Sequence, residues 1–460
     1  MKILTARYVL PISSAPIENG AVAFEKDKIA AVGTRAEMIA KFPEAEVESL
    51  GASAILPGFV NAHSHLEITA MRGFVDEFDD DFTSWLLTLT KVRGEILTDE
   101  DVQNAAILGA IEGAHAGVTC FGDIGRFGKN GFEALKAVGL RGVVFQETEF
   151  SPDDRTADAD FARLKEKFLA LQETETNLVK VGLSPHSPYT VGRRLFQNIA
   201  AFAIENDVKI SVHAAESDEE SELMEKGTGF FAGIYEKYGF EWRTPHCSSI
   251  ELLDKLGVLR AKPLLAHCVK VSERDVELIK TSDSRIAHCP KSNAKFGHGI
   301  APFEKFLDAN IKTGFGSDSM ASNNTCDILE EARFATLFAR NLPARKRFLQ
   351  AAEIIEAATL GGAKALGLEN EIGTLEAGKQ ADLAVVSLEN IAQIPVHDVY
   401  SALLFASNAR DIRLTIVAGE EVFRVGESRK IDEHEIKAKM REISQKMKSS
   451  VPSPKSQVPS

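Results

Sequence analysis

The central part of the chain, residues 52–320, repeats one pattern of hydrophobic and polar positions. Each repeat has a short apolar or β-branched run that ends in polar residues, followed by a longer segment with helical periodicity. This alternation is typical of strand–helix units and a parallel sheet. Eight such units predict an α/β protein built on a (β/α)8 TIM barrel. The expected strands cover residues 55–63, 117–124, 139–147, 179–186, 208–216, 264–271, 284–292 and 311–319.

The segment 101–116 illustrates the helices expected between these strands. It begins with acidic residues, continues with periodic apolar positions, and is followed directly by Gly117. Acidic residues near the first turn and a glycine after the last turn are the usual signals for the two ends of a helix.

Both ends of the chain show a different pattern. Residues 1–51 contain short alternating segments separated by turn residues, and a similar pattern returns at 372–388 and 412–425. We therefore expect both ends to form one small composite β-sandwich beside the barrel, with helices near 345–368 and 431–448. The predicted organisation is the first part of the sandwich at 1–55, the barrel at 56–370, the second part of the sandwich at 371–428, and a C-terminal helix with a disordered tail, SSVPSPKSQVPS, at 429–460.

Composition favours a small-molecule substrate. The formal net charge of -14 disfavours binding to a nucleic acid polymer or an anionic membrane, because both would be repelled. The N-terminus has no apolar core of signal-peptide length, and no apolar run of ~18 residues appears elsewhere, so a cytoplasmic location is expected. The five cysteines are scattered and form no CxxC pair, which fits a reducing compartment.

The first candidate chemistry is a metal site. His63 and His65 are two residues apart at the end of the first predicted strand, so both imidazoles point to the same, inward face. His213 ends the fifth strand and Asp318 ends the eighth, at the carboxyl rim where catalytic groups of barrels gather. Three neutral nitrogens and one carboxylate suit a single divalent ion, with Zn²⁺ favoured and Fe²⁺ as the alternative, and leave room for a water.

Two further residues are candidates for moving protons beside such an ion. Glu216 lies three residues after His213, and the chain must turn after that histidine to bring the carboxylate over the metal. We assign Glu216 as the proton shuttle. The alternative is that Glu216 is a solvated acid in the run ESDEESE and has no catalytic role. His267 ends the sixth strand and is either a fifth ligand or, as we favour, a stabiliser of the attacking hydroxide and the tetrahedral intermediate.

His186, in SPHSPY at the end of the fourth strand, is expected to touch substrate, with a structural role as the alternative. A binuclear site would need a carboxylated lysine on this strand. The nearest lysine, Lys180, begins the strand and is at the wrong end. We therefore expect a mononuclear site.

These motifs, VNAHSHLE, SPHSPY, HAAE, AHCV, HCPKSN and GSDSMASNN, resemble the amidohydrolase superfamily in their order and in their places on the strands. The segment GTLEAGKQADLAVV is similar to the strand signature of that family's composite β-sandwich. Within the superfamily, the pattern resembles the aromatic-ring aminohydrolases. The resemblance implies that Glu216 protonates a ring nitrogen and that His267 and Asp318 help to activate the water.

The chain resembles several groups within that branch to different degrees. Methylthioadenosine deaminases carry a ribose-binding glutamate after the first strand, but here the region FTSWLLTLTKVRGEIL has no proline before Glu95. The stretches WLLTLTKVRGE, FQETEF and CPKSNAKFGHGIAPF are more similar to the 6-aminodeoxyfutalosine deaminases of menaquinone biosynthesis. Such a substrate carries a benzoate, which Arg93 or Arg126 could bind in bidentate fashion. Surface arginines are the alternative for both.

The sequence thus predicts a deaminase of an adenosine-type nucleoside, with 6-aminodeoxyfutalosine favoured and methylthioadenosine or adenosylhomocysteine next. One alternative is a hydrolase that removes chloride or an amine from a triazine-like ring. Another is a non-catalytic barrel scaffold, against which the retention of all four ligands and of Glu216 argues. The sequence leaves open whether the protein is a homo-oligomer.

Overall fold

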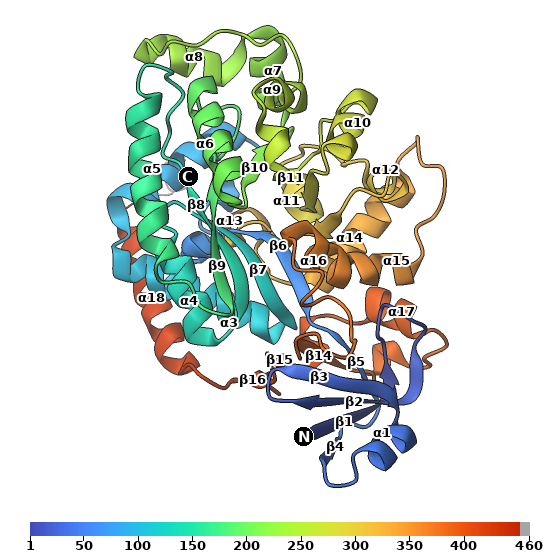
Figure 1. Ribbon diagram of the computed structural model, residues 1–460. Helices are drawn as coiled ribbons and strands as arrows, with labels where there is room; N and C mark the ends of the chain where they lie inside the picture. Colours follow the sequence, from blue (N-terminus) through green and yellow to red (C-terminus); the bar gives the residue numbers. More distant parts are fainter. Residues whose placement is uncertain (451–460) are drawn as a thin grey trace, which may run out of the picture.

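The computed structural model describes residues 1–450. The tail that was expected to be disordered consists almost entirely of residues 451–460, which lie outside the described residues. Figure 1 shows a larger part built of strands and surrounding helices, and below it a smaller β-rich part that contains the N-terminus. All five cysteines are buried and free.

Eight parallel strands form the barrel. They are hydrogen-bonded as two four-stranded sheets, β6 to β9 and β10 to β13. Isolated bridges Leu183–Ile210 and Ser64–Asp318 join the two sheets on both sides. The predicted TIM barrel is confirmed. Its strands are Phe59–Ser64 (β6), Val118–Gly125 (β7), Arg141–Glu147 (β8), Val179–Ser184 (β9), Ser211–Ala214 (β10), Leu264–His267 (β11), Arg285–His288 (β12) and Thr313–Phe315 (β13).

Helices surround the strands because their apolar faces pack on the outer face of the barrel. The helix expected at 101–116 is α3, which Thr98 and Asp101 cap reciprocally and which Gly117 follows with a φ of 77°. The helices are Phe82–Lys91 (α2), Asp99–His115 (α3), Lys129–Val138 (α4), Ala157–Gln172 (α5), Arg193–Asn206 (α6), Asp218–Lys226 (α7), Gly229–Tyr238 (α8), Ser249–Lys255 (α9), Glu273–Thr281 (α10), Pro290–Lys295 (α11), Phe303–Asp308 (α12), Met320–Asn323 (α13), Ile328–Asn341 (α14), Ala351–Glu356 (α15), Gly362–Leu366 (α16), Val399–Ser401 (α17) and Glu433–Ser450 (α18).

Short helical segments fill several connections between these elements. Those with 3-10 geometry are Leu66–Met71, Asp76–Phe78, Val258–Ala261, Ile391–Gln393 and Ala409–Asp411. Those with π geometry are Val92–Ile96, Ala357–Gly361 and Ala402–Ala406.

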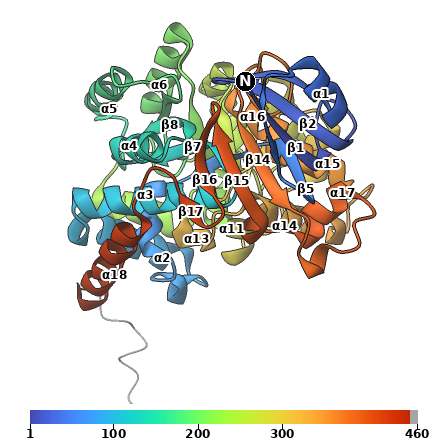
Figure 2. The same ribbon diagram turned by 90° about the horizontal axis from the view of Figure 1, so that it is seen from below.

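Both chain ends contribute to the smaller β-rich part, as predicted. Its strands form one continuous nine-stranded sheet in the order β17-β16-β15-β14-β5-β1-β2-β3, with β4 paired to β1. Figure 2 shows β14 and β15 from the C-terminal end beside β1, β2 and β5 from the N-terminal end. The strands are Lys2–Val9 (β1), Ile17–Glu25 (β2), Lys28–Thr34 (β3), Glu46–Ser49 (β4), Ser53–Pro57 (β5), Leu383–Ser387 (β14), Ile412–Val417 (β15), Glu420–Arg424 (β16) and Glu427–Ser428 (β17).

One element of this part was not expected. The sequence of residues 1–51 indicated only strands, but Arg35–Lys41 forms a helix, α1. Thr34 and Glu37 cap its first turn reciprocally, and Met38 is its buried apolar contact. This capping box stabilises the N-terminus of a helix that has too few residues for a clear apolar period.

The C-terminal helix α18 packs against the rim of the barrel that carries the site described below. Its buried Ile443 and Met447 belong to the same apolar cluster as Phe82, Trp85 and Leu89 of α2. Within residues 1–450, no helix has both the length and the apolar character needed to cross a membrane.

Candidate metal centre and active site

Four side chains meet at the carboxyl rim of the barrel, as the sequence predicted. His63 is on β6, His65 follows that strand directly, and His213 is on β10. Asp318 lies three residues after the end of β13, where its backbone N–H donates to the carbonyl of His63 over 3.0 Å. This close approach needs Gly316, because a Cβ there would lie 2.6 Å from the Cβ of His63.

The ligand atoms converge on one point. The Nε2 atoms of His63 and His65 each lie 3.5 Å from Oδ1 of Asp318. The Nε2 atoms of His65 and His213 are 3.1 Å apart. The structure therefore brings all four sequence-predicted ligands together.

Hydrogen bonds on the other ring nitrogens orient two of the imidazoles. Nδ1 of His65 lies 3.0 Å from the carbonyl oxygen of Ile124, and Nδ1 of His213 lies 3.0 Å from that of His186. Because a carbonyl only accepts, both Nδ1 atoms carry the proton and both Nε2 atoms present a lone pair. This is the tautomer that a metal ligand needs.

The carboxylate of Asp318 is oriented in the same way. Its Oδ2 accepts hydrogen bonds from the hydroxyls of Ser292 and Ser322 at 2.6 and 2.8 Å, which leaves Oδ1 to face the histidines. Burial raises the pKa of Asp318, but the close approach of His63 and the other nearby imidazoles outweighs burial and holds the pKa well below its usual range.

The chemistry of these residues fits a divalent ion. Both ring nitrogens of His63 are buried and have no hydrogen-bond partner among the described residues. Such orphaned groups are rare in folded proteins unless a water or an ion satisfies them. Burial lowers the pKa of His63 to about 3 and that of His65 well below its usual value, so both are neutral at pH 7, as ligands must be.

Glu216 reaches the same point because the chain turns directly before it, as expected. Ala215 adopts a left-handed conformation with a φ of 53°. The Glu216 carboxylate is 5% exposed; its Oε1 lies 3.6 Å from Nε2 of His267, and its Oε2 accepts from the hydroxyl of Tyr189 at 3.4 Å. Burial raises the pKa of Glu216 to about 7, so it can hold or release a proton near neutral pH.

His267 ends β11 with a left-handed φ of 73°. Its Nδ1 lies 2.9 Å from Oδ1 of Asn293, so that nitrogen carries a proton. Its Nε2 is buried, has no hydrogen-bond partner among the described residues, and belongs to a possible ligand group with His63 and Asp318. The geometry is therefore compatible with both roles weighed from the sequence.

His186 and Arg93 lie at the outer edge of the site. Nδ1 of His186 lies 2.9 Å from the hydroxyl of Ser187, and its Nε2 lies 3.8 Å from Oε1 of Glu147. Arg93 approaches the other oxygen of Glu147 at 4.0 Å, and its Nε is buried without a partner among residues 1–450. Arg126 lies farther out and forms an ion pair with Glu149.

The site opens into a larger, mostly apolar vestibule, by which we mean the cavity lined by the outer residues named below. The pocket around the candidate ligands has a volume of about 80 Å³, and the vestibule about 550 Å³. Leu86, Arg93, Glu147 and His186 line both spaces, so the two are adjacent. The vestibule is lined further by Leu87, Thr90, Arg126, Thr148, Glu149, Phe150, Thr190, Phe230, Phe231, Ile234, Lys237, Tyr238 and Phe240.

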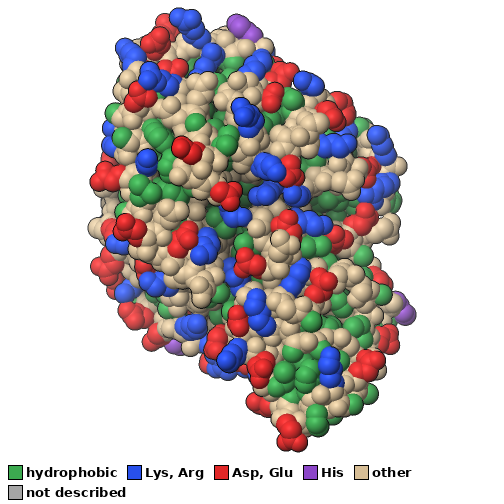
Figure 3. Space-filling model, viewed as in Figure 1, with side chains coloured by type: hydrophobic (Ala, Val, Ile, Leu, Met, Phe, Trp, Pro, Cys, Tyr) green, Lys and Arg blue, Asp and Glu red, His purple; other side chains and the backbone are tan. Residues whose placement is uncertain are grey.

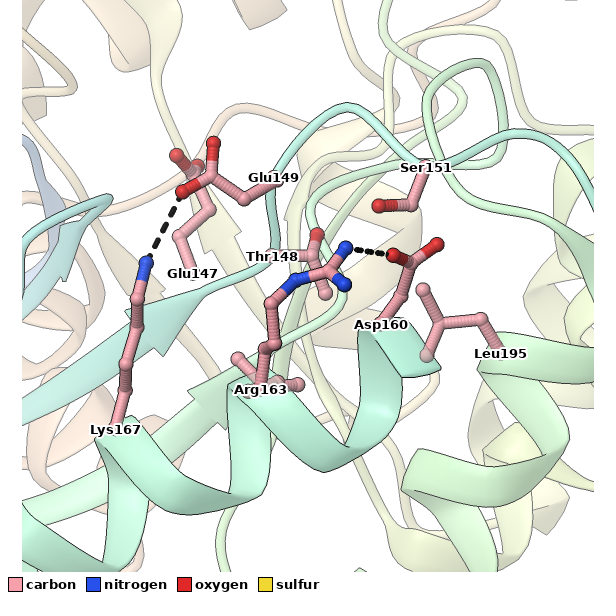
Figure 4. Close-up of a pocket in the computed structure, with 9 residues that line it drawn as sticks. Glu147, Thr148, Glu149, Ser151, Asp160, Arg163, Lys167 and Leu195 are labelled. Carbon is pink, nitrogen blue, oxygen red and sulfur yellow. Dashed lines mark hydrogen bonds and ion pairs between the residues drawn. The ribbon is translucent and has the colours of Figure 1, made fainter. Parts of the chain in front are cut away.

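A neighbouring hollow of about 370 Å³ has a different character. Figure 4 shows Arg163 and Lys167 of α5 reaching toward Asp160 and Glu149. Each of these cations is paired with one of these acids, Arg163 with Asp160 and Lys167 with Glu149. This hollow is therefore charged but locally neutralised, whereas the vestibule presents aromatic rings.

Sequence analysis missed two residues that face Glu216. Tyr189 lies five residues after Ser184, the end of β9, and is 2% exposed. His298 is 4% exposed; its Nε2 has no hydrogen-bond partner in the described part of the chain and lies 4.0 Å from Oε1 of Glu216. Tyr189 stands near a strand end in SPHSPY, and His298 lies beyond the helix α11 that follows β12, in CPKSNAKFGHG. Membership of these two motifs was the signal that could have found them.

A cluster of buried histidines and a carboxylate at the carboxyl rim of a TIM barrel defines the class of barrel hydrolases with a metal centre. Comparison with known families matches residues 54–422 to the amidohydrolase family and residues 20–45 to the imidazolonepropionase-like composite domain of bacteria. The chain belongs to the amidohydrolase family.

Relatives that are named as deaminases are similar over nearly the whole chain. It is 30% identical to the 5-methylthioadenosine/S-adenosylhomocysteine deaminase of Thermodesulfovibrio yellowstonii, over 94% of this chain and 96% of the relative. It is also 30% identical to the 5'-deoxyadenosine deaminase of Methanobrevibacter smithii, over 93% of this chain and 94% of the relative. The prediction of a hydrolytic deaminase is confirmed.

Solved structures support the same fold. An adenosine deaminase from Xanthomonas campestris with bound zinc has a TM-score of 0.85 at 28% identity and covers 97% of this chain and 98% of its own. The aminofutalosine deaminase of Helicobacter pylori, in complex with methylthio-coformycin, has a TM-score of 0.76 at 24% identity, over 92% and 100%. At that identity the second likeness concerns the fold alone.

Proposed function

We propose that this protein is a metal-dependent deaminase of an adenosine-type nucleoside. In the reaction, water adds to the ring carbon that bears the amino group, the carbon–nitrogen bond breaks, and ammonia leaves. The observation that carries the proposal is the placement of buried Glu216 and His267 beside four convergent candidate ligands. The names of the deaminase relatives support the choice of nucleoside.

We propose His63, His65, His213 and Asp318 as the ligands of one divalent ion. Zn²⁺ is the favoured ion, because the similar adenosine deaminase structure contains zinc; Fe²⁺ suits the same donors. When bound, the ion supplies Lewis acidity and lowers the pKa of a water to about 7. Lys180 is half exposed at the start of β9 and is paired with Glu175, so no bridging lysine supports a second ion.

The side chains of the protein move the protons. Asp318 accepts a proton from the attacking water at a carboxylate oxygen. The protonated Glu216 carboxyl delivers its proton to a ring nitrogen. Glu216 then takes the proton of the added hydroxyl and delivers it to the amino group, so that ammonia leaves and a carbonyl remains. The proton held by Asp318 returns to Glu216, which restores both carboxyl groups. Nε2 of His267 presents a lone pair, because Nδ1 carries the proton, and accepts a hydrogen bond from the attacking water and from the hydroxyl that is added to the ring carbon.

Within this class we propose 6-aminodeoxyfutalosine, an intermediate of menaquinone biosynthesis, as the substrate. Ligand sites usually need about 300–1,000 Å³, so the 80 Å³ pocket can hold only the reacting ring and the rest must enter the vestibule. The rings of Phe150, Phe231 and Tyr238 line that space and suit an aromatic tail. Arg93, Arg126 and Lys237 supply cations for a carboxylate at its end.

A panel of nucleosides tests this choice. We expect kcat/KM to be highest for 6-aminodeoxyfutalosine and lower by at least about tenfold for methylthioadenosine and adenosylhomocysteine, because only the first fills the vestibule with an aromatic ring. The ultraviolet change on deamination measures each rate. A preference for methylthioadenosine would refute the futalosine assignment and keep the deaminase. Release of chloride from a triazine, with no ammonia from any nucleoside, would favour the alternative hydrolase.

A substitution of Arg126 tests whether this residue binds the carboxylate at the end of the substrate's aromatic tail. Replacing Arg126 by Met should raise KM for 6-aminodeoxyfutalosine by about 10- to 100-fold, the value of a charged hydrogen bond, while KM for methylthioadenosine stays within a factor of two. Arg163→Met is the matched control, because Arg163 lines the neighbouring hollow and is paired with Asp160 there. Equal effects of Arg126→Met on both substrates would exclude Arg126 from tail binding.

A further inference from the structure

The acidic run 216–222 contains a second buried carboxylate besides Glu216. Glu220, in the first turn of α7, is fully buried, whereas the side chain of Asp218 in the same turn is 80% exposed. A buried carboxylate is costly unless hydrogen bonds compensate it. The partners of Glu220 therefore indicate what this side chain does.

Glu220 accepts from the backbone that carries Glu216. Its Oε1 accepts the N–H of Ala215 at 2.9 Å and the hydroxyl of Ser249. Its Oε2 accepts the N–H of Glu216 at 2.8 Å. Both oxygens are thus used to hold two successive backbone N–H groups.

The segment held in this way is strained. Ala215 has a φ of 53°, in the left-handed region that a residue with a Cβ adopts only under strain. The opposite side of the same turn is fixed by the carbonyl of Ala215, which accepts the N–H groups of Val269 and Lys270 at 2.8 Å each. Without Glu220, two N–H groups would lose their acceptors and the turn would lose one of its two supports.

We propose that Glu220 is a positioning residue that fixes the Ala215–Glu216 turn and so holds the Glu216 carboxylate against His267 and Tyr189. The inference rests on the proton-transfer role proposed for Glu216. Glu220 itself does not line the pocket around the candidate ligands, so it acts through the backbone that it binds.

The effect of Glu220 on catalysis should be large because proton transfer depends on geometry. A displacement of about 1 Å at a reacting group can cost about 100-fold in rate. Replacing Glu220 by Gln keeps the shape but leaves one oxygen, and the new NH₂ group faces a backbone N–H. The turn must then shift, and the Glu216 carboxylate shifts with it.

The test compares Glu220→Gln with Asp218→Asn, a control from the same helical turn. We expect Glu220→Gln to lower kcat on the best substrate by about 10- to 100-fold, with KM changed less than threefold and metal content unchanged. Asp218→Asn should leave kcat within a factor of two. A rise in KM with no change in kcat would overturn the proposal, and so would kinetics identical to those of the parent protein.

A double-mutant cycle separates positioning from a general structural role. If Glu220 acts through Glu216, adding Glu220→Gln to Glu216→Gln should lower the residual rate by less than about twofold, because coupled residues are not additive. A further 10-fold loss in the double variant would contradict the proposal. A fully active Glu216→Gln would overturn this inference and the proposed function together, whereas an inactive Glu216→Gln with a fully active Glu220→Gln would overturn only the inference.

Ser249→Ala is the second variant, in case Glu220→Gln does not fold. It removes one hydrogen bond to Oε1 of Glu220 and leaves both backbone contacts in place. We expect a smaller fall in kcat, about two- to fivefold, which disappears in the Glu216→Gln background. An equal fall in both backgrounds would overturn the proposal.

Discussion

Glu216→Gln should lower kcat for nucleoside deamination by about 10²–10⁴-fold, the usual value of a positioned acid or base. Gln has the same shape but cannot carry the proton that the ring nitrogen and the amino group need. The carboxylate is buried and contacts His267 and Tyr189, so water cannot readily replace it. Steady-state assays give kcat, and elemental analysis gives the metal content.

Metal content is the internal control for this variant, because Glu216 is not among the proposed ligands. It should stay near one ion per chain. Glu219→Gln, in the same acidic run, is the matched variant and should retain kcat within a factor of about three, since Glu219 is partly exposed and does not line the pocket. A Glu216→Gln protein with a kcat near that of the parent would remove Glu216 from the mechanism.

The second large effect is expected for His65→Ala. The imidazole provides one of the Nε2 atoms that converge on Asp318, and its loss leaves three donors. Metal content should fall well below one ion per chain, and kcat should fall by at least about 10³-fold, because Lewis acidity contributes several kcal/mol. Elemental analysis and ammonia assays on the same sample measure both.

The control for this substitution is His397→Ala, because His397 is exposed and far along the chain from the rim strands. It should keep both metal and activity. If His65→Ala retains a full equivalent of metal and turns over normally, His65 is not a ligand and the proposed centre is wrong.

The face of the molecule shown in Figure 3 gives no reason to prefer a polymeric substrate. Acidic and basic side chains are interspersed over the face shown in Figure 3, in keeping with a net charge of -14. Paired surface charges of this kind produce little long-range attraction for a polyanion.

Regular periodicity made the barrel and the convergence of the proposed metal ligands predictable. The period-two spacing of His63 and His65 fixed the direction of both imidazoles, and their ring centroids lie 4.9 Å apart. His213 could be placed because it stands within a β-branched strand. Asp318 was harder, because β13 ends at Phe315 and the aspartate reaches the site through a left-handed residue conformation.

The remaining features depend on irregular backbone and on tertiary contacts. Ala215, His267 and Asp318 all have positive φ, a conformation that no sequence period encodes and that is typical of functional sites. Glu220 is one acid among several in its run, and only the fold shows that it is buried. The vestibule could not be predicted because its walls come from segments as far apart as Leu86 and Phe240.

The most direct test of the central claim is metal titration of the chelator-treated protein, with ammonia release from 6-aminodeoxyfutalosine, methylthioadenosine and adenosylhomocysteine as the readout. The account predicts no turnover without metal, activity that rises linearly with Zn²⁺ or Fe²⁺ up to one ion per chain and then stays constant, and one ammonia per nucleoside consumed. The account would be contradicted if ammonia release did not depend on added metal. It would also be contradicted if no nucleoside released ammonia from the fully metal-loaded protein.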